Sequence, residues 1–174
     1  MRHATTRNLV YCALFSALTA VCAWVTIPIG PVPISLVTFA VMMAGLLLGW
    51  KYGLLAMAVY ILLGLAGAPV FTGFRAASAL LGPTGGYIAG YLPYVTLAGL
   101  NLPKMQRSFA GRCALLVCGT VCCYALGTAW FMHVTGRTLP ESMGLCVLPF
   151  LPGDAVKIVL SALLAPRLRQ AMKL

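Results

Sequence analysis

The chain has 174 residues, of which 61% are hydrophobic and 8% are charged, and its mean hydropathy is +0.98. This composition excludes a water-soluble globular domain, because soluble domains carry about 25% charged residues. The net charge of +10 does not indicate nucleic-acid binding, because the basic residues are scattered between apolar segments and form no continuous face. The sequence predicts an all-α integral membrane protein, with residues 1–174 forming a single domain surrounded by membrane lipid.

Apolar runs predict a bundle of six transmembrane helices. A hydrocarbon core about 30 Å thick takes roughly 20 helical residues per crossing, so the chain has room for six short spans. In chain order, the predicted spans are residues 9–27, 34–48, 52–65, 85–102, 113–134 and 151–165. The second and third spans are short for a full crossing, which indicates bilayer thinning, burial against neighbours or helices that stop inside the protein. A tight turn at Gly49-Trp50-Lys51 joins them.

The basic residues divide unequally between the two sides of this six-helix model. The richer side carries nine of them: Arg2, Arg7, Lys51, Lys104, Arg107, Arg112, Arg167, Arg169 and Lys173. The other side holds only Arg75 and Arg137. Because cytoplasmic loops carry the excess of Lys and Arg, both termini are predicted to be cytoplasmic. Five or seven spans would place the last basic cluster opposite Arg2 and Arg7.

Small residues recur in the first predicted helix, with Ala13 and Ala17 four positions apart. Residues at this spacing lie on one helix face and let another helix approach closely. Two interpretations are open at this point. The step packs inside the bundle, or it docks a separate membrane subunit.

A glycine-rich segment, Gly82-Pro-Thr-Gly-Gly-Tyr87, follows a long loop of small residues and opens the fourth predicted helix. Thr84 suits the capping position, and the glycines would let a ligand approach the free N–H groups of a positive helix end. Alternatively, Gly86 and Gly90 form a GxxxG step for close helix packing. Tyr87 suits either stacking on a ligand or the aromatic belt at the membrane interface.

The chain contains only two acidic side chains, Glu141 and Asp154, and Asp154 lies at the start of the last span with Lys157 three residues later. An ionisable group inside a membrane is costly unless it meets a partner, a water-filled cavity or a ligand. The spacing places both charges on one helix face. They form either an ion pair that neutralises itself or a binding site, in which Lys157 meets a ligand carboxylate and Asp154 accepts from ligand N–H groups.

Several motifs of catalysis and metal binding are absent from the sequence. It contains no GxxxxGK[ST] phosphate loop, no HExxH and no GxSxG. The two histidines are isolated, and the seven cysteines lack paired CxxC spacing, so we predict packing roles for the cysteines and no metal site. The chain is therefore not predicted to be an enzyme, and no cofactor is expected. Transport against a gradient would draw its energy from another subunit or from an ion gradient.

Three separated segments carry a family resemblance: Pro31-Val-Pro-Ile-Ser35, then Ala66-Gly-Ala-Pro-Val-Phe-Thr-Gly-Phe74 leading into Gly82–Tyr87, and finally Pro149-Phe-Leu-Pro-Gly-Asp-Ala-Val-Lys157. In this order they resemble the BioY family, the biotin-binding substrate subunits (S components) of energy-coupling-factor (ECF) transporters. The resemblance implies a six-helix protein of the bacterial inner membrane that captures biotin from outside. It also implies association with a transmembrane coupling (T) subunit and two ATPase subunits.

The resemblance also assigns residue roles. Asp154 and Lys157 match the aspartate and lysine that contact biotin in the family, while Phe74 and Tyr87, together with Phe71, would cover its rings. Ser78 and Thr84 are the candidates for a polar contact from the long loop. Ala13 and Ala17 match the small-residue step that meets the coupling subunit.

Two other functions remain open from the residues themselves. The first is a stand-alone secondary carrier for a vitamin-like carboxylic acid, in which Asp154 titrates as the proton-coupling group. The second is a structural membrane protein in which Asp154 and Lys157 only neutralise each other.

Overall fold

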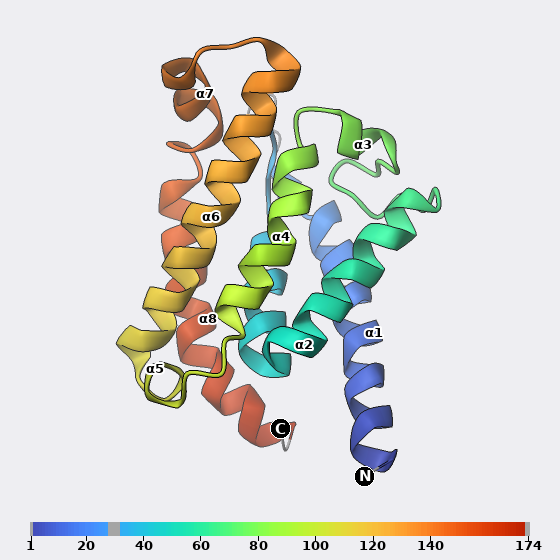
Figure 1. The fold of residues 1–174 in the computed structure, drawn as a ribbon, viewed down its shortest axis with the longest axis vertical. Helices are drawn as coiled ribbons and strands as arrows, with labels where there is room; N and C mark the ends of the chain where they lie inside the picture. The colour runs from blue at the N-terminus through green and yellow to red at the C-terminus, as the bar shows by residue number, and fades with distance from the viewer. Residues whose placement is uncertain (1, 28–31, 173–174) are drawn as a thin grey trace.

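The computed structural model describes residues 2–27 and 32–172, so Pro31 and Lys173 of the patterns above lie outside the described residues. The described chain is mainly helical, as predicted, with one short β-ribbon that was not predicted (Figure 1). The elements in chain order are α1 (Arg2–Trp24), β1 (Thr26–Ile27), β2 (Ile34–Ser35), α2 (Val37–Leu65), α3 (Ser78–Leu81), α4 (Gly85–Ala98), α5 (Pro103–Arg107), α6 (Phe109–Thr135), α7 (Leu139–Cys146) and α8 (Leu151–Ala171).

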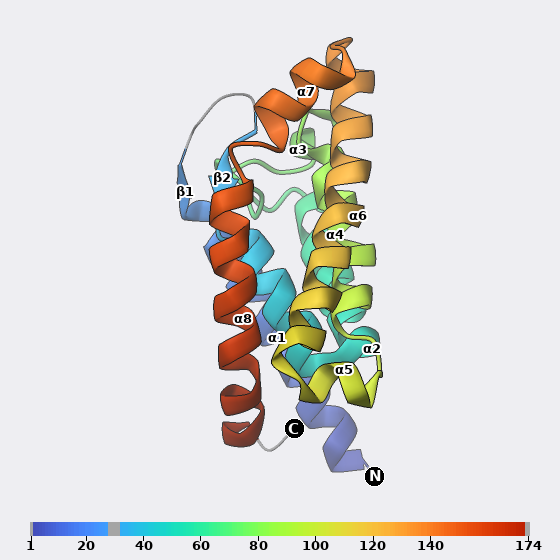
Figure 2. The same ribbon diagram turned by 90° about the vertical axis from the view of Figure 1, so that its left-hand side faces the viewer.

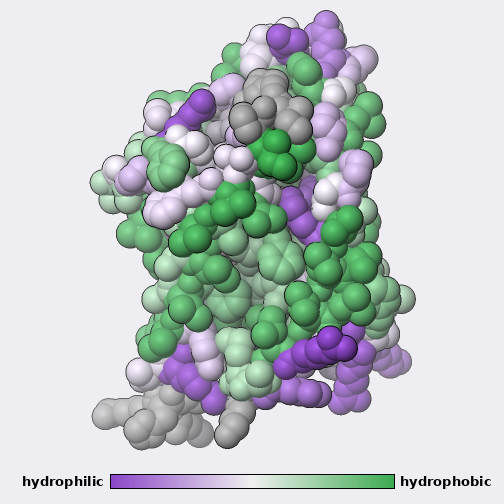
Figure 3. Space-filling view, turned by 180° about the vertical axis from the view of Figure 1, so that it is seen from behind, coloured by the Kyte–Doolittle hydropathy of each residue, from purple (hydrophilic) through white to green (hydrophobic). Residues whose placement is uncertain are grey.

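Several helices are suited to a membrane. Within the described residues, three helices are long and apolar enough to cross one: Thr6–Trp24 in α1, all of α2, and all of α6. Helices α7 and α8 together meet the same test as a pair bent by 53°. Figure 3 shows a broad hydrophobic band, in green, between two ends where hydrophilic residues gather. The chain is therefore a multi-pass membrane protein.

Helix α2 is broken at Gly49, whose backbone φ of 73° and ψ of 174° are not helical. The limbs 37–48 and 50–65 are about 18 and 24 Å long at 1.5 Å per residue, which agrees with the two short spans and the turn predicted there. The turn is held by the Trp50 amide, which donates to the Gly99 carbonyl over 2.9 Å. This contact also explains why α4 ends at Ala98 and not at the predicted residue 102. A Cβ on Gly99 would lie 2.4 Å from the Trp50 nitrogen, so the chain here is pressed against the α2 turn.

Several other helix ends differ from the predicted spans. Helix α1 begins at Arg2 and not at residue 9, α2 begins at Val37 and not at residue 34, and α8 continues to Ala171, beyond the predicted residue 165. Residues 25–27, predicted as helix, leave α1 and form β1, which pairs antiparallel with β2 through Thr26 and Ser35 and through Ile27 and Ile34. Helix α6 begins at Phe109, four residues before the predicted start, because the Ser108 hydroxyl accepts from the Gly111 amide and caps the helix.

The close packing predicted from Gly86 and Gly90 is present between α4 and α6. A Cβ on Gly86 would lie 2.3 Å from the Trp130 Cβ and 2.7 Å from the Leu126 carbonyl oxygen. At Gly90 it would lie 3.0 Å from the Cys123 sulfur. The two helix backbones therefore approach so closely that glycine is required at Gly86.

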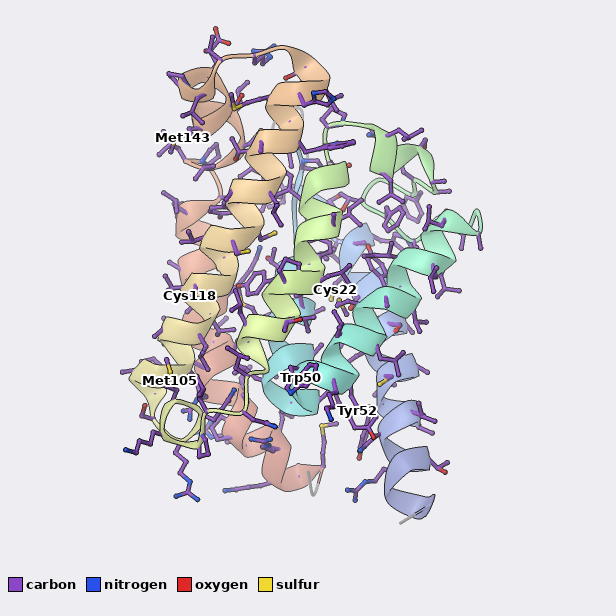
Figure 4. The ribbon with its side chains drawn as sticks, viewed as in Figure 1. Cys22, Trp50, Tyr52, Met105, Cys118 and Met143 are labelled. Carbon is purple, nitrogen blue, oxygen red and sulfur yellow. The ribbon has the colours of Figure 1, made fainter. Side chains whose placement is uncertain are left out.

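The two ends of the bundle differ. Figures 1 and 2 show the start of α1, the end of α8 and α5 at one end, with α3 and α7 at the other. Figure 4 places Trp50, in the break of α2, and Met105, in α5, at the end that carries the termini. The structure therefore gathers the basic connections of the sequence at one end, here called the terminal end.

Arg112 lies in the first turn of α6, and its side chain is buried, with 9% of the residue exposed. Its guanidinium donates to three backbone carbonyls, those of Ala162 in α8 (2.9 Å), Gln106 (2.8 Å) and Arg107 (3.1 Å). It therefore joins α5, α6 and α8.

Replacing Arg112 with Met is expected to lower the free energy of unfolding by about 1–3 kcal/mol, because three carbonyls lose a charged donor. Thermal unfolding in detergent measures this effect. Lys104→Met, at an exposed position of α5, is the matched control and should change the melting temperature little. Equal melting temperatures for both variants would contradict the joining role of Arg112.

Candidate functional site

The first turn of α8 carries the buried charged pair. Pro152 lies in the first helical turn, where a missing N–H costs nothing, and Asp154 follows at the positive helix end. Asp154 is 3% exposed and Lys157 is 8% exposed. The Lys157 Nζ lies 2.9 Å from Asp154 Oδ1, so the predicted meeting of these residues on one helix face is confirmed.

Residues from β2, α2 and α6 complete the hydrogen bonding of this pair. Lys157 Nζ also donates to the Ser35 carbonyl (2.8 Å) and to the Thr38 hydroxyl (2.9 Å). The Thr38 hydroxyl donates to Asp154 Oδ1 over 3.2 Å, and the Tyr124 hydroxyl donates to Asp154 Oδ2 over 2.5 Å. All three N–H groups of the ammonium and both carboxylate oxygens have partners, which is what burial of two charges requires.

A small cavity of about 40 Å³ lies beside the pair. Its lining comes from the β1–β2 connection, β2, α2, α4, α6, the α7–α8 connection and α8: Val32, Pro33, Ser35, Thr38, Tyr87, Tyr91, Cys123, Tyr124, Phe150, Asp154 and Lys157. Pockets for small organic molecules measure about 300–1,000 Å³. A drug-sized ligand would therefore enter only if some of these side chains or connections moved apart.

Tyr87 lies in the wall of this cavity and is 8% exposed, so it is not a residue of the aromatic belt. Its ring packs on the bare backbone of Gly127, where a Cβ would lie 2.3 Å from the ring. Its hydroxyl lies 3.3 Å from the Thr128 hydroxyl and donates to the Cys146 carbonyl over 3.3 Å. The ring face is thus fixed next to the charged pair by contacts with α6 and α7.

The other predicted site residues lie outside the cavity lining. Phe74 is exposed, has a φ of 58°, and stacks on Trp24 at a ring distance of 5.3 Å. Ser78 begins α3 and is exposed. Thr84 occupies the position before α4, but its hydroxyl donates to the Ala79 carbonyl over 3.0 Å, so the predicted side-chain cap is wrong. Phe71, named with them above, is buried against Tyr60.

Ala13 and Ala17 lie on the exposed face of α1. The opposite face of the helix is buried against α2 through Cys12, Phe15 and Ser16, and the Ser16 hydroxyl donates to the Ala56 carbonyl over 2.7 Å. Of the two interpretations of the small-residue step, packing inside this bundle is therefore wrong for the described chain.

Sequence reasoning missed Thr38 and Tyr124, the two hydroxyls that hold Asp154. A buried tyrosine hydroxyl needs a partner, so an isolated tyrosine in the middle of an apolar helix was the available signal for Tyr124. Thr38 had no such signal, because threonine can bond to its own helix. Tyr91 and Phe150, which line the cavity, resemble ordinary core residues in the sequence.

The arrangement can recognise a small amphiphilic molecule. It offers one cation, one anion and the hydroxyls of Thr38 and Tyr124, which can each donate or accept. Four aromatic rings line the same space, those of Tyr87, Tyr91, Tyr124 and Phe150. Since the site is buried, each polar contact with a ligand is stronger than in water. Among the described residues, no group of three or more His, Cys, Asp or Glu side chains could hold a metal ion.

Known proteins are similar to this chain over at least 90% of its length. The model of the BioY family matches residues 1–174. Biotin transporter BioY of Thermotoga maritima is 40% identical over 165 residues, which cover 94% of this chain and 96% of that protein. The probable biotin transporter BioY of Pyrococcus horikoshii is 41% identical over 158 residues, covering 90% and 93%. A crystal structure of the S-component for biotin from an ECF-type ABC transporter superposes with a TM-score of 0.90 at 32% identity, covering 98% of this chain and 94% of that one.

Proposed function

This chain belongs to the BioY family, and we propose that it takes up biotin across the bacterial cell membrane as the substrate-binding S component of an ECF-type transporter. The observation that carries the proposal is the buried Asp154–Lys157 pair beside a cavity, in a chain that superposes on an S-component for biotin. The homologues are named as transporters, and we assign no catalysis to this chain.

Biotin offers the groups that this site can satisfy. Its carboxylate would bind Lys157, and the N–H groups of its ureido ring would donate to Asp154. Both charges already have partners, so the ligand must replace some of them. Thr38 and Tyr124 suit such an exchange, because a hydroxyl can rotate to a new partner. Tyr87 would then cover the rings, with Phe74, Ser78 and Thr84 joining only if the long loop closes over the ligand.

The membrane topology that we propose has six crossings, made by α1, the two limbs of α2, α4, α6 and α8. Helix α4 is about 21 Å long at 1.5 Å per residue, less than the hydrocarbon core, which is consistent with local thinning of the bilayer. The common location of the two described chain ends (Figure 1) and the basic residues of that end support cytoplasmic termini. Biotin would then enter from the outer side, where α3 and α7 lie.

Energy for uptake would come from partners. We propose that a T subunit and two ATPase subunits associate with this chain and that Ala13 and Ala17 on α1 meet the T subunit. Their exposure on a helix whose other face is buried supports this role, because small residues let a partner helix come close.

Equilibrium binding of labelled biotin to the detergent-purified chain tests the proposal. We expect saturable binding of one biotin per chain, with competition by unlabelled biotin. Failure to bind would leave the structural membrane protein as the better account. Uptake by the chain alone that an uncoupler abolishes, and that ATPase partners do not affect, would favour the secondary carrier.

Tyr124→Phe is expected to weaken biotin binding about tenfold, because it removes the hydroxyl that would rotate from Asp154 to the ligand. A hydrogen bond contributes about 0.5–1.5 kcal/mol, and about 1.4 kcal/mol corresponds to a factor of ten in affinity. The same binding assay measures the change. The matched control is Tyr11→Phe, which removes a hydroxyl that donates to the Met172 carbonyl near the chain ends and should leave affinity unchanged. Equal affinities for both variants would remove Tyr124 from the site.

A further inference from the structure

A second, larger cavity lies at the terminal end of the bundle and belongs to no site described above. Its volume is about 470 Å³, and it lies between the α2 break, the α4–α5 connection, α5 and the last turns of α8. Its lining is Gly45, Leu46, Gly49, Gly99, Asn101, Leu102, Pro103, Gln106, Arg107 and Arg169. We call it the terminal-end pocket.

The polar side chains of the terminal-end pocket have unused donors. Asn101, Arg107 and Arg169 are exposed, and none has a side-chain hydrogen bond or ion pair among the described residues. Gln106 is different, because its amide donates to the carbonyls of Ala98 (3.0 Å) and Leu100 (3.2 Å). Two guanidinium groups and one amide therefore remain for an external partner.

Neither acidic side chain of this chain lies near the terminal-end pocket. Asp154 precedes Arg169 by 15 residues on α8, about 22 Å along the helix axis, and it is paired with Lys157. Glu141 lies in α7, at the other end of the bundle (Figure 1). Both acidic side chains are thus unavailable to these arginines, which leaves them free to bind an anion from outside the chain.

Helix ends do not cancel this positive charge. Helices α4 and α8 end near the pocket and α6 begins there, so their ends contribute about −0.5 elementary charge in total. Arg107 and Arg169 contribute two positive charges, and buried Arg112 adds a third behind them, bonded to the Gln106 and Arg107 carbonyls. The pocket keeps a strong positive potential.

Apolar residues at the rim indicate the kind of anion. Leu46, Leu102 and Pro103 share the lining with the polar groups. In Figure 3 the hydrophilic residues of this end directly border the green hydrophobic band, so this end lies at the level of lipid headgroups. Basic pockets between membrane helices at this level bind anionic headgroups, and paired guanidinium groups suit phosphate oxygens.

We propose that the terminal-end pocket binds the phosphate group of an anionic membrane phospholipid, with Arg107 and Arg169 contacting the phosphate, Asn101 the headgroup and the rim residues the first acyl carbons. This site is separate from the biotin site and does not depend on the function proposed above. A bound lipid would tie the α2 turn, α5 and the end of α8 to one another.

Native mass spectrometry of the detergent-purified chain, with equal amounts of palmitoyl-oleoyl phosphatidylglycerol and phosphatidylcholine added, tests the proposal. We expect preferential retention of phosphatidylglycerol. In Arg107→Gln/Arg169→Gln this preference should fall roughly 25-fold, since each basic residue near the surface contributes about a factor of five. Arg107→Lys/Arg169→Lys keeps the charge and should retain part of the preference.

The matched control is Arg75→Gln/Arg137→Gln, which removes the same charge at the opposite end and should keep the full preference. Equal preference in all variants would overturn the proposal. Binding of inorganic phosphate as tightly as of phosphatidylglycerol, with displacement of the lipid, would overturn it in favour of a free-phosphate site. A third outcome would also overturn the proposal: the unsubstituted chain shows no lipid preference, and proteins that copurify with it from the membrane are lost from the Arg107→Gln/Arg169→Gln variant. That outcome would favour an acidic protein partner.

Discussion

Asp154→Asn is expected to abolish high-affinity biotin capture and to lower the free energy of unfolding by about 3–5 kcal/mol, because it leaves the Lys157 ammonium buried without its counter-ion. Lys157→Met should have the same two effects, since it leaves the Asp154 carboxylate with only Thr38 and Tyr124. Biotin binding and thermal unfolding of the purified chain measure the two effects separately.

The double variant Asp154→Asn/Lys157→Met distinguishes a binding site from a purely structural ion pair. Removing both charges also removes the cost of burying them, so stability should return close to that of the unsubstituted chain. Biotin binding should stay lost. Glu141→Gln, at the only other acidic position, is the control and should bind biotin normally. A stable double variant that still binds biotin would show that the pair is structural.

Gly127→Ala is the second change with a large expected effect. A Cβ there would lie 2.3 Å from the Tyr87 ring, which itself lines the biotin cavity. Either the ring moves into the cavity or α4 separates from α6, so we expect at least a tenfold loss of biotin affinity. We also expect a loss of stability of about 1–3 kcal/mol, as for other overpacked cores.

The control Gly144→Ala is expected to act in the opposite direction. Gly144 lies in α7, and a Cβ there would meet nothing within 4 Å. Alanine in an unobstructed helix position is more favourable than glycine by about 1 kcal/mol, so the melting temperature should rise while biotin binding is unchanged. A gain of stability in Gly127→Ala as well would contradict the tight contact between Gly127 and Tyr87.

The long helices could be predicted from apolar runs alone, including the break between the second and third segments at Gly49. The short helices α3, α5 and α7 were not predicted, because they are too short to form an apolar run. The ends could not, because tertiary contacts set them. Helix α4 stops where Gly99 meets Trp50, and α1 stops where residues 26–27 pair with β2. Neither contact leaves a local pattern in the sequence.

The charged pair could be predicted because two buried charges in an apolar helix are conspicuous. Its surroundings could not. Ser35 contributes a backbone carbonyl, which any residue could supply, and Thr38 and Tyr124 approach from other helices. The loop residues Phe74 and Ser78 were expected near the ligand by resemblance, and the present arrangement places them outside the cavity.

The role of Ala13 and Ala17 on α1 could be predicted only as one of two alternatives, packing inside the bundle or docking a separate subunit. Small residues serve packing within a bundle and docking of a partner equally well. The choice depended on which side of α1 contacts α2, and that is fixed by Phe15 and Ser16, not by Ala13 and Ala17.

A structure of the chain with biotin bound tests the central claim most directly. We predict the biotin carboxylate within hydrogen-bonding distance of the Lys157 ammonium, roughly 2.7–2.9 Å for charged partners, the ureido N–H groups on Asp154, and the Tyr87 ring against the ligand. Biotin bound elsewhere, with the hydrogen bonds between Asp154, Lys157, Thr38 and Tyr124 unchanged, would contradict it.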